Sequence, residues 1–256
     1  MPALRVPEGS GRPHLSAVEL TPEARATLLT DGEITVVGRV AWSSNAALLV
    51  TVERDGVEML AVYKPARGER PLWDFPDGSL CRRETAAFLL SESLGWEIVP
   101  RTVLRDGPYG VGSVQRFVDH DPNDHYFTLL EDHIDVFLRF AVFDVLANNA
   151  DRKGGHCLQE RGTGKIFGID HGLTFHVSPK LRTVIWDFAG EHVPDWLVAD
   201  VASLRARLDG GLAEDFAALL LPIEVEAMTR RADELLLDGR LPQPDEGYHS
   251  VPWPMI

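Results

Sequence analysis

The stretch NNADRKGGH at residues 148–156 and the stretch GIDHG at residues 168–172 carry the strongest signal for a fold in this sequence. Two short apolar segments lie between them, at 157–160 and 165–169, separated by a glycine-containing turn at 161–164. Short apolar runs bounded by turn residues are typical of paired strands. The sequence therefore predicts an antiparallel hairpin whose open end carries both polar stretches.

His156 and Asp170 flank this predicted hairpin, directly before its first strand and directly after its second. Paired positions in an antiparallel ladder lie roughly 5 Å apart, so the hairpin returns the two side chains to one place. An imidazole and a carboxylate so placed can chelate a divalent cation. Asp151, a few residues earlier, is then free to accept a proton or to orient a nucleophile. The alternative is a solvated acidic turn that binds nothing.

Two charged residues upstream of the hairpin are further candidates. Lys64 closes a predicted apolar strand at 57–63, and Glu84 lies in a predicted helix at 80–94. Arginine supplies nearly all other basic residues, and the compact ammonium of a lysine suits a phosphate oxygen. Glu84 lies beside the apolar face of its helix and could reach across to orient Lys64. Alternatively, Lys64 reaches solvent and Glu84 pairs with a neighbouring arginine.

A loop with the sequence GRVAWSSN at residues 38–45 joins the first two predicted strands. Ser43, Ser44 and Asn45, together with exposed backbone N–H groups, could cradle phosphates. The loop matches neither a Walker A loop nor a GxGxxG loop, and an ordinary hairpin turn explains it equally well.

Around these motifs the chain divides into a small β-rich half and a mainly helical half. In the first half, three strand signals between residues 33 and 64, two of them joined by an Asp-Gly turn, predict an antiparallel meander. The predicted helix at 80–94 and strands at 99–104 and 112–118 follow. After a proline-containing connector at 119–125, helical patterns occupy 126–149 and most of 195–240. We predict an α+β fold with a lead-in at 1–30, one lobe at 31–120, a second at 121–240 and a proline-rich tail at 241–256.

Composition limits the function classes. The 256 residues include 45% hydrophobic and 25% charged residues, and the net charge is −14. This acidity disfavours binding to nucleic acid or anionic membranes, and a bound polyanion would need a metal ion. Two cysteines exclude a disulfide framework. Without a run of about 18 apolar residues or a signal-peptide pattern, we expect a cytoplasmic protein with no transmembrane segment.

The order of these motifs resembles the protein-kinase-like fold, with a small antiparallel-sheet N-lobe and a mainly helical C-lobe. A strand-borne Lys64 and a helical Glu84 precede Asn-x-Asp-Arg, a hairpin and Asp-x-Gly. The sequence more closely resembles the phosphatidylinositol 3-/4-kinase-like branch, which includes bacterial HipA-type kinases. The stretches NADR at 149–152 and IDHGLTF at 169–175 are especially similar to type II phosphatidylinositol 4-kinases. The resemblance covers roughly residues 33–240.

The resemblance implies an ATP-dependent phosphotransferase that uses Mn²⁺ or Mg²⁺, and it implies a role for each candidate residue. Asp151 would be the catalytic-loop aspartate, Lys64 and Arg152 would be catalytic with it, and Asp170 and His156 would hold the metal. The residues expected to contact the nucleotide, or to hold those that do, are Lys64, Glu84, Ser43, Ser44, Asn45, Gln115, Phe117 and Val118.

His156 departs from the family pattern, in which the second metal ligand is usually asparagine. Imidazole favours later divalent ions, so we predict better support by Mn²⁺ than by Mg²⁺. The same departure leaves a nucleotide-binding pseudokinase open, as well as an enzyme that transfers AMP instead of the γ-phosphate. The acceptor is also open between a protein, the chain itself, a small molecule and a lipid head group. Only Lys180 and Arg182 are basic between Asp170 and Glu191, fewer than an anionic lipid surface would favour.

Overall fold

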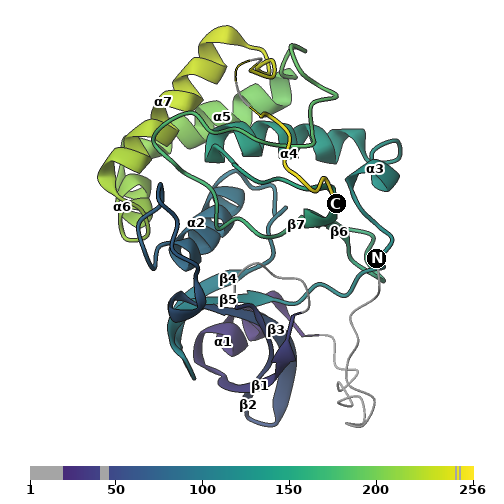
Figure 1. Ribbon diagram of the computed structural model, residues 1–256, viewed down its shortest axis with the longest axis vertical. Helices are drawn as coiled ribbons and strands as arrows, with labels where there is room; N and C mark the ends of the chain where they lie inside the picture. The colour runs from purple at the N-terminus through teal and green to yellow at the C-terminus, as the bar shows by residue number, and fades with distance from the viewer. Residues whose placement is uncertain (1–19, 41–45, 246, 248) are drawn as a thin grey trace.

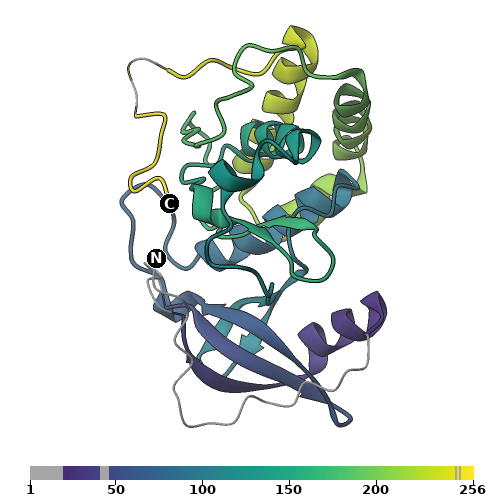
Figure 2. The same cartoon turned by 90° about the vertical axis from the view of Figure 1, so that its right-hand side faces the viewer.

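The computed structural model describes residues 20–40, 46–245, 247 and 249–256. It has the predicted α+β class, with a five-stranded antiparallel sheet at one end and a mainly helical part at the other (Figure 1). Figure 2 shows the two parts as separate lobes joined through the middle of the chain. Within the described ranges, no helix is long and apolar enough to cross a membrane. The division of the chain into the four predicted segments remains a prediction.

The sheet has the strand order β1-β2-β3-β5-β4. Asp55 and Gly56 both have positive φ, 54° and 77°, which fits the tight turn predicted between the second and third strands. All neighbouring strands pair antiparallel, so the predicted meander is confirmed. The strands are β1 (Glu33–Arg39), β2 (Leu48–Arg54), β3 (Val57–Pro65), β4 (Thr102–Gly107) and β5 (Gly110–Arg116).

Helix α1 (Pro22–Asp31) covers one face of this sheet. Its buried Leu28 and Leu29 join a core with alternate residues of β3, including Ala61 and Tyr63. Successive side chains of a strand point to opposite faces. Lys64 therefore projects from the other face, away from the α1 core.

Helix α2 (Leu80–Ser93) belongs to the core of the helical lobe, although the chain places it between strands. Its buried Ala86, Ala87 and Leu90 pack in one cluster with residues of the C-terminal helices. The helices of that lobe are α3 (Tyr126–Leu129), α4 (Ile134–Ala147), α5 (Asp195–Leu208), α6 (Gly211–Ala217) and α7 (Pro222–Asp238). Because α2 packs on this lobe, it is fixed relative to the NNADRKGGH stretch.

The single helix predicted at 126–149 is wrong, because the structure has two helices, α3 and α4, separated by a turn. The polar run Glu131-Asp132-His133 lies in that turn, and His133 has a non-helical backbone (φ −137°, ψ 38°). Helix α4 ends at Ala147, and its C-cap Asn148 has a left-handed backbone (φ 48°) that turns the chain sharply into the NNADRKGGH stretch.

The predicted hairpin is present as β6 (Cys157–Gln159) and β7 (Ile166–Gly168). Short 3-10 turns occupy Ala66–Gly68 and Gly154–His156. The backbone N–H of Ile169 donates to the carbonyl of His156 at 2.9 Å, which extends the pairing to the mouth of the hairpin. The hairpin lies between the sheet and the helical lobe (Figure 1).

Candidate active site

Three charged side chains from distant parts of the chain meet beside the hairpin. The Lys64 ammonium at the end of β3 pairs with the Glu84 carboxylate of α2, and it lies 2.9 Å from Oδ1 of Asp170. The other Glu84 oxygen accepts the backbone N–H of His171 at 3.1 Å. Glu84 therefore holds both the lysine and the segment that carries Asp170.

Helix α2 is anchored by two sets of contacts in the turn that precedes Glu84. At its start, the Glu69 carboxylate accepts the backbone N–H groups of Leu80 and Cys81, at 3.1 and 2.8 Å. Next to Glu84, the buried Arg83 pairs with Glu224 of α7 and donates to the carbonyl of Thr174 at 2.6 Å. The residue that orients Lys64 is thus held by contacts to both lobes.

Burial and the neighbouring negative charges shift the pKa of Lys64 in opposite directions. Burial disfavours the charged form, but Asp170 and Glu84 together raise the pKa of Lys64 above its ordinary value. The pKa of Asp170 is lowered, chiefly by the charge of Lys64. Lys64 is therefore a cation and Asp170 an anion at neutral pH.

His156 faces Asp170 across the hairpin mouth. Its Nε2 lies 3.4 Å from Oδ2 of Asp170. Burial lowers the pKa of His156 to about 4, so the imidazole is neutral at pH 7. Asp170 has a left-handed backbone (φ 61°), which is uncommon for a non-glycine residue and is found at functional sites.

This pair fits a divalent cation. An imidazole nitrogen and an ionised carboxylate 3.4 Å apart are two ligands of the types that divalent cations accept, and a cation would displace the proton from Nε2. No group of three or more His, Cys, Asp or Glu side chains suited to a metal occurs in the described part of the chain. Mg²⁺ commonly takes further oxygen ligands from water and from substrate phosphates.

Asp151 lies on the loop between α4 and the hairpin, with a lysine beside it. Lys153 Nζ is 3.1 Å from Asp151 Oδ2, and Arg182 Nη2 is 4.0 Å from Oδ1. Burial raises the pKa of Asp151, and the charge of Lys153 opposes that change. Sequence reasoning missed both basic partners. The scarcity of lysine was a signal that could have drawn attention to Lys153, two positions after Asp151.

Arg152 is fully buried, so it does not line an exposed surface. Its guanidinium pairs with Asp144 of α4 at 2.9 Å and donates to the carbonyl of Ile169 at 3.3 Å. It also lies 2.7 Å from Nε2 of His171, whose pKa burial lowers well below its usual value. The geometry gives Arg152 a positioning role, because it ties the Asp151 loop to the segment that carries Asp170.

The other residues predicted to contact a nucleotide fall into two groups, one in the segment after β1 and one at the end of β5 and just after it. Ser43, Ser44 and Asn45 lie outside the described residues. The buried Gln115 donates its side-chain amide to Thr102 Oγ1 at 2.8 Å, and its backbone lies between β3 and β4. The Phe117 N–H donates to the carbonyl of Leu60 at 3.2 Å. Val118 is buried against the hairpin residues Leu158 and Phe167. Contact between these three residues and a nucleotide remains a prediction.

Comparison with known proteins identifies the family. A sequence model described as "Phosphatidylinositol 3- and 4-kinase" matches residues 80–220, more than half of the chain. The chain belongs to this family. The family resemblance stated from the sequence motifs is therefore confirmed, and it supports a phosphotransferase-like function.

One relative and two solved structures are similar to this chain. Protein Rv2133c of Mycobacterium tuberculosis is 42% identical over 262 residues, covering 89% of this chain and 94% of that protein. The Helicobacter pylori proinflammatory kinase CtkA has a TM-score of 0.50 at 15% identity, covering 80% and 92% of the two chains. Hydra Fam20, solved with sugar, has a TM-score of 0.52 at 11% identity, covering 84% and 87%. At these identities the two structures show the kinase-like fold alone.

Proposed function

We propose that this member of the phosphatidylinositol 3- and 4-kinase family is an ATP-dependent phosphotransferase that transfers the γ-phosphate with a divalent metal. The observation that carries the proposal is the contact network that joins Lys64, Glu84 and Asp170, with His156 facing Asp170. Phosphoryl transfer depends on positioning and on stabilising charge, and this network supplies groups for both.

Lys64 would bind oxygens of the triphosphate. Its ammonium is held by Glu84, whose side chain is only 3% exposed, so its position does not depend on the nucleotide. Asp170 and His156 would hold Mn²⁺ or Mg²⁺, and a metal bound there would supply neutralisation of the triphosphate charge. The neutralisation is needed because the chain itself has a net charge of −14 and would otherwise repel the triphosphate.

Asp151 would orient the acceptor hydroxyl and take its proton. As the bond between the acceptor oxygen and the γ-phosphorus forms, the bond from that phosphorus to the β–γ bridging oxygen breaks, and ADP leaves. Lys153 lies 3.1 Å from Asp151 and would stabilise charge on the transferred group. Lys153 and Arg182 beside Asp151 favour an acceptor that is neutral or negatively charged rather than cationic. The acceptor would be a protein, a small molecule or a lipid head group.

A second candidate is a nucleotide-binding module without turnover. It is favoured by His156, which stands where the family usually has asparagine. Transfer of AMP is a third candidate that would use the same residues with the nucleotide reversed.

Labelled ATP separates these candidates. With Mn²⁺ present, label from γ-labelled but not α-labelled ATP should be released or transferred, and Asp151→Ala should lower the rate by roughly 100-fold or more. Asp215→Ala, which removes an exposed carboxylate on α6, is the matched control and should leave the rate unchanged. ATP binding without release of either label would support the module, and transfer of α-label would support AMP transfer. No binding of ATP with Mn²⁺ would refute all three.

A further inference from the structure

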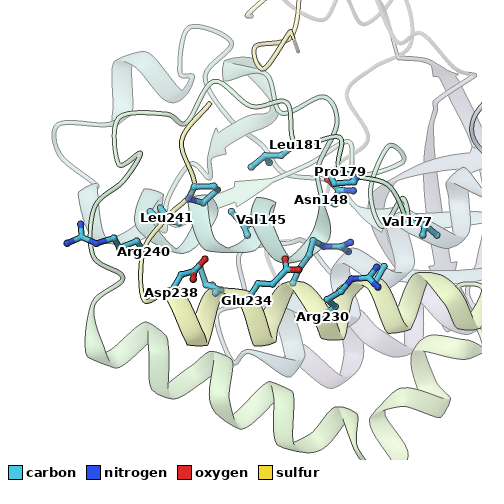
Figure 3. Close-up of a pocket in the computed structure, with 14 residues that line it drawn as sticks. Val145, Asn148, Val177, Pro179, Leu181, Arg230, Glu234, Asp238, Arg240 and Leu241 are labelled. Atoms are coloured by element: carbon cyan, nitrogen blue, oxygen red, sulfur yellow. The ribbon is translucent and has the colours of Figure 1, made fainter. Parts of the chain in front are cut away.

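A pocket of about 620 Å³ opens on the helical lobe, between the end of α4, the helix α7 and the segment 177–181 (Figure 3). Its lining includes none of Lys64, Glu84, Asp151 or Asp170, so it is separate from the site described above. Its volume is in the range of pockets that bind small organic molecules.

The walls of this pocket are largely apolar. Val145 of α4, Pro179 and Leu181 of the crossing segment, and Leu235 and Leu241 near the end of α7 all line it. Figure 3 shows Val145 between the crossing segment and α7, with Leu241 at the end nearer Asp238. These side chains suit the hydrocarbon or aromatic body of a ligand.

Two arginines of α7 give one end of the pocket a positive charge. The buried Nη2 of Arg231 has no hydrogen-bond partner within the described residues. Its other nitrogens donate only to neutral carbonyls, those of Leu146 at 2.9 Å and His176 at 3.4 Å. Burial and the charge of Arg230 lower the pKa of Arg231 to about 10. The charge of Glu234 acts in the opposite sense, but no carboxylate of the described residues lies within ion-pair distance of Arg231, so an anion nearby would stabilise it.

Arg230 supplies the donor that a ligand can reach. It is exposed, lines the pocket, and lies in Figure 3 toward Val177 and Pro179, whereas Asp238 lies toward the other end. Glu234 also lines the pocket, between these two on α7. Arg240 lines the pocket as well, near Leu241 and Asp238 in Figure 3, so three arginines face two carboxylates, a balance that suits a ligand with a single negative charge and opposes a highly charged anion.

We propose that this pocket binds an organic anion with one negative charge and an apolar body. The acid group lies at Arg230, within the field of Arg231. The apolar body extends along Val145 toward Leu241.

The end of α4 ties the proposed site to the catalytic loop. The Asn148 amide donates to the carbonyls of His176 and Ser178, at 2.8 Å each, and its oxygen accepts the N–H of Lys180 at 2.8 Å. Asn148 also lines the pocket. A ligand there contacts the residue three positions before Asp151.

The test uses the full chain and anilinonaphthalene sulfonate, a fluorescent monoanion with an aromatic body. Binding should raise its fluorescence, and decanoate should displace it at a lower concentration than decanol, which has the same chain without the charge. Val145→Phe, which narrows the pocket, should weaken probe binding.

Two variants of exposed residues give opposite expectations. Arg230→Gln should weaken decanoate binding about three- to tenfold, and Glu234→Gln should tighten it by a similar factor, because each removes one unit of charge beside the ligand. Both residues are exposed, so thermal melting should be little changed.

Once the probe binds, any of three results would overturn the proposal. They are equal displacement by decanol and decanoate, no opposite shift between the two charge variants, or probe binding that Val145→Phe leaves unchanged. A pocket that takes a protein segment would bind neither small molecule, which also overturns it. ATP titration of the same samples reports on the other site, so failure here leaves the proposed phosphotransferase untouched.

Discussion

Replacing Glu224 by glutamine should lower the stability of the protein and weaken its proposed nucleotide site at the same time. Glu224 on α7 pairs with Arg83 on α2, and the two side chains are 5% and 1% exposed. Arg83 also donates to the Thr174 carbonyl and lies over the ring of Phe75, 4.8 Å from its centroid. The substitution keeps the shape of Glu224 and removes its charge, so the Arg83 cation stays buried without a counter-charge.

The expected loss follows from that burial. Removing one partner of a buried ion pair costs about 3–5 kcal/mol. Glutamine retains an oxygen that can accept from Arg83, so we expect the lower end, about 3 kcal/mol of the free energy of unfolding. For a chain of this size that corresponds to a fall in Tm of roughly 6–12 °C. Because Arg83 directly precedes Glu84, the affinity for ATP with Mn²⁺ should fall as well.

Urea unfolding and ATP titration measure the two effects. Glu226→Gln is the matched control, since Glu226 lies on the same helix but is exposed, and it should change stability by less than about 0.5 kcal/mol. The double variant Arg83→Met with Glu224→Leu replaces both charges by apolar groups and should recover most of the lost stability. If Glu224→Gln behaves like Glu226→Gln, the ion pair does not hold α2 and the reasoning fails.

Three further perturbations address the site itself. His156→Asn should reduce the preference for Mn²⁺ over Mg²⁺ in ATP titrations, and an unchanged preference would remove His156 from the metal site. Since the pKa of His156 falls from 6.5 to about 4 on folding, its contribution to stability is present above pH 6.5 and is lost as the pH falls through 4. Wild type should therefore lose more stability than His156→Asn in urea melts between those values, and parallel losses would contradict the burial argument. Gly112→Ala should weaken ATP binding, because its methyl group would approach the carbonyl oxygen of Lys64 to 2.5 Å. Gly38→Ala, with open space around it, is the control and should not.

The sequence predicts those parts of the site whose structure depends on residues that are close together in the chain. The hairpin needs only two apolar runs and a turn, and its Gly162 and Gly164 adopt the positive φ that such turns use. Its register alone brings His156 to Asp170. Lys64 and Glu84 were placed by a different route, because the order of motifs along the chain resembled a known fold.

The contacts that hold α2 could not be read from the sequence. Arg83 and Glu224 are 141 positions apart, and each looks like an ordinary charged residue on an amphipathic helix. Their burial depends on how α2 packs against α7, which no local pattern specifies. The ion pair of Arg152 with Asp144 was equally hidden from the sequence. Because Arg152 directly follows the predicted catalytic aspartate, its position favoured a role in the reaction over a buried structural role.

The two carboxylates that share Lys64 differ in exposure, and that difference separates their roles. The Glu84 side chain is 3% exposed and also accepts the N–H of His171, so leaving Lys64 would strand a buried charge. The Asp170 side chain is 46% exposed and has His156 as a second neighbour. A triphosphate arriving at Lys64 would therefore replace Asp170 more easily than Glu84. Asp170, once released, keeps a charged carboxylate beside the neutral imidazole of His156. The lysine proposed to bind the nucleotide would thus determine when the proposed metal pair becomes free.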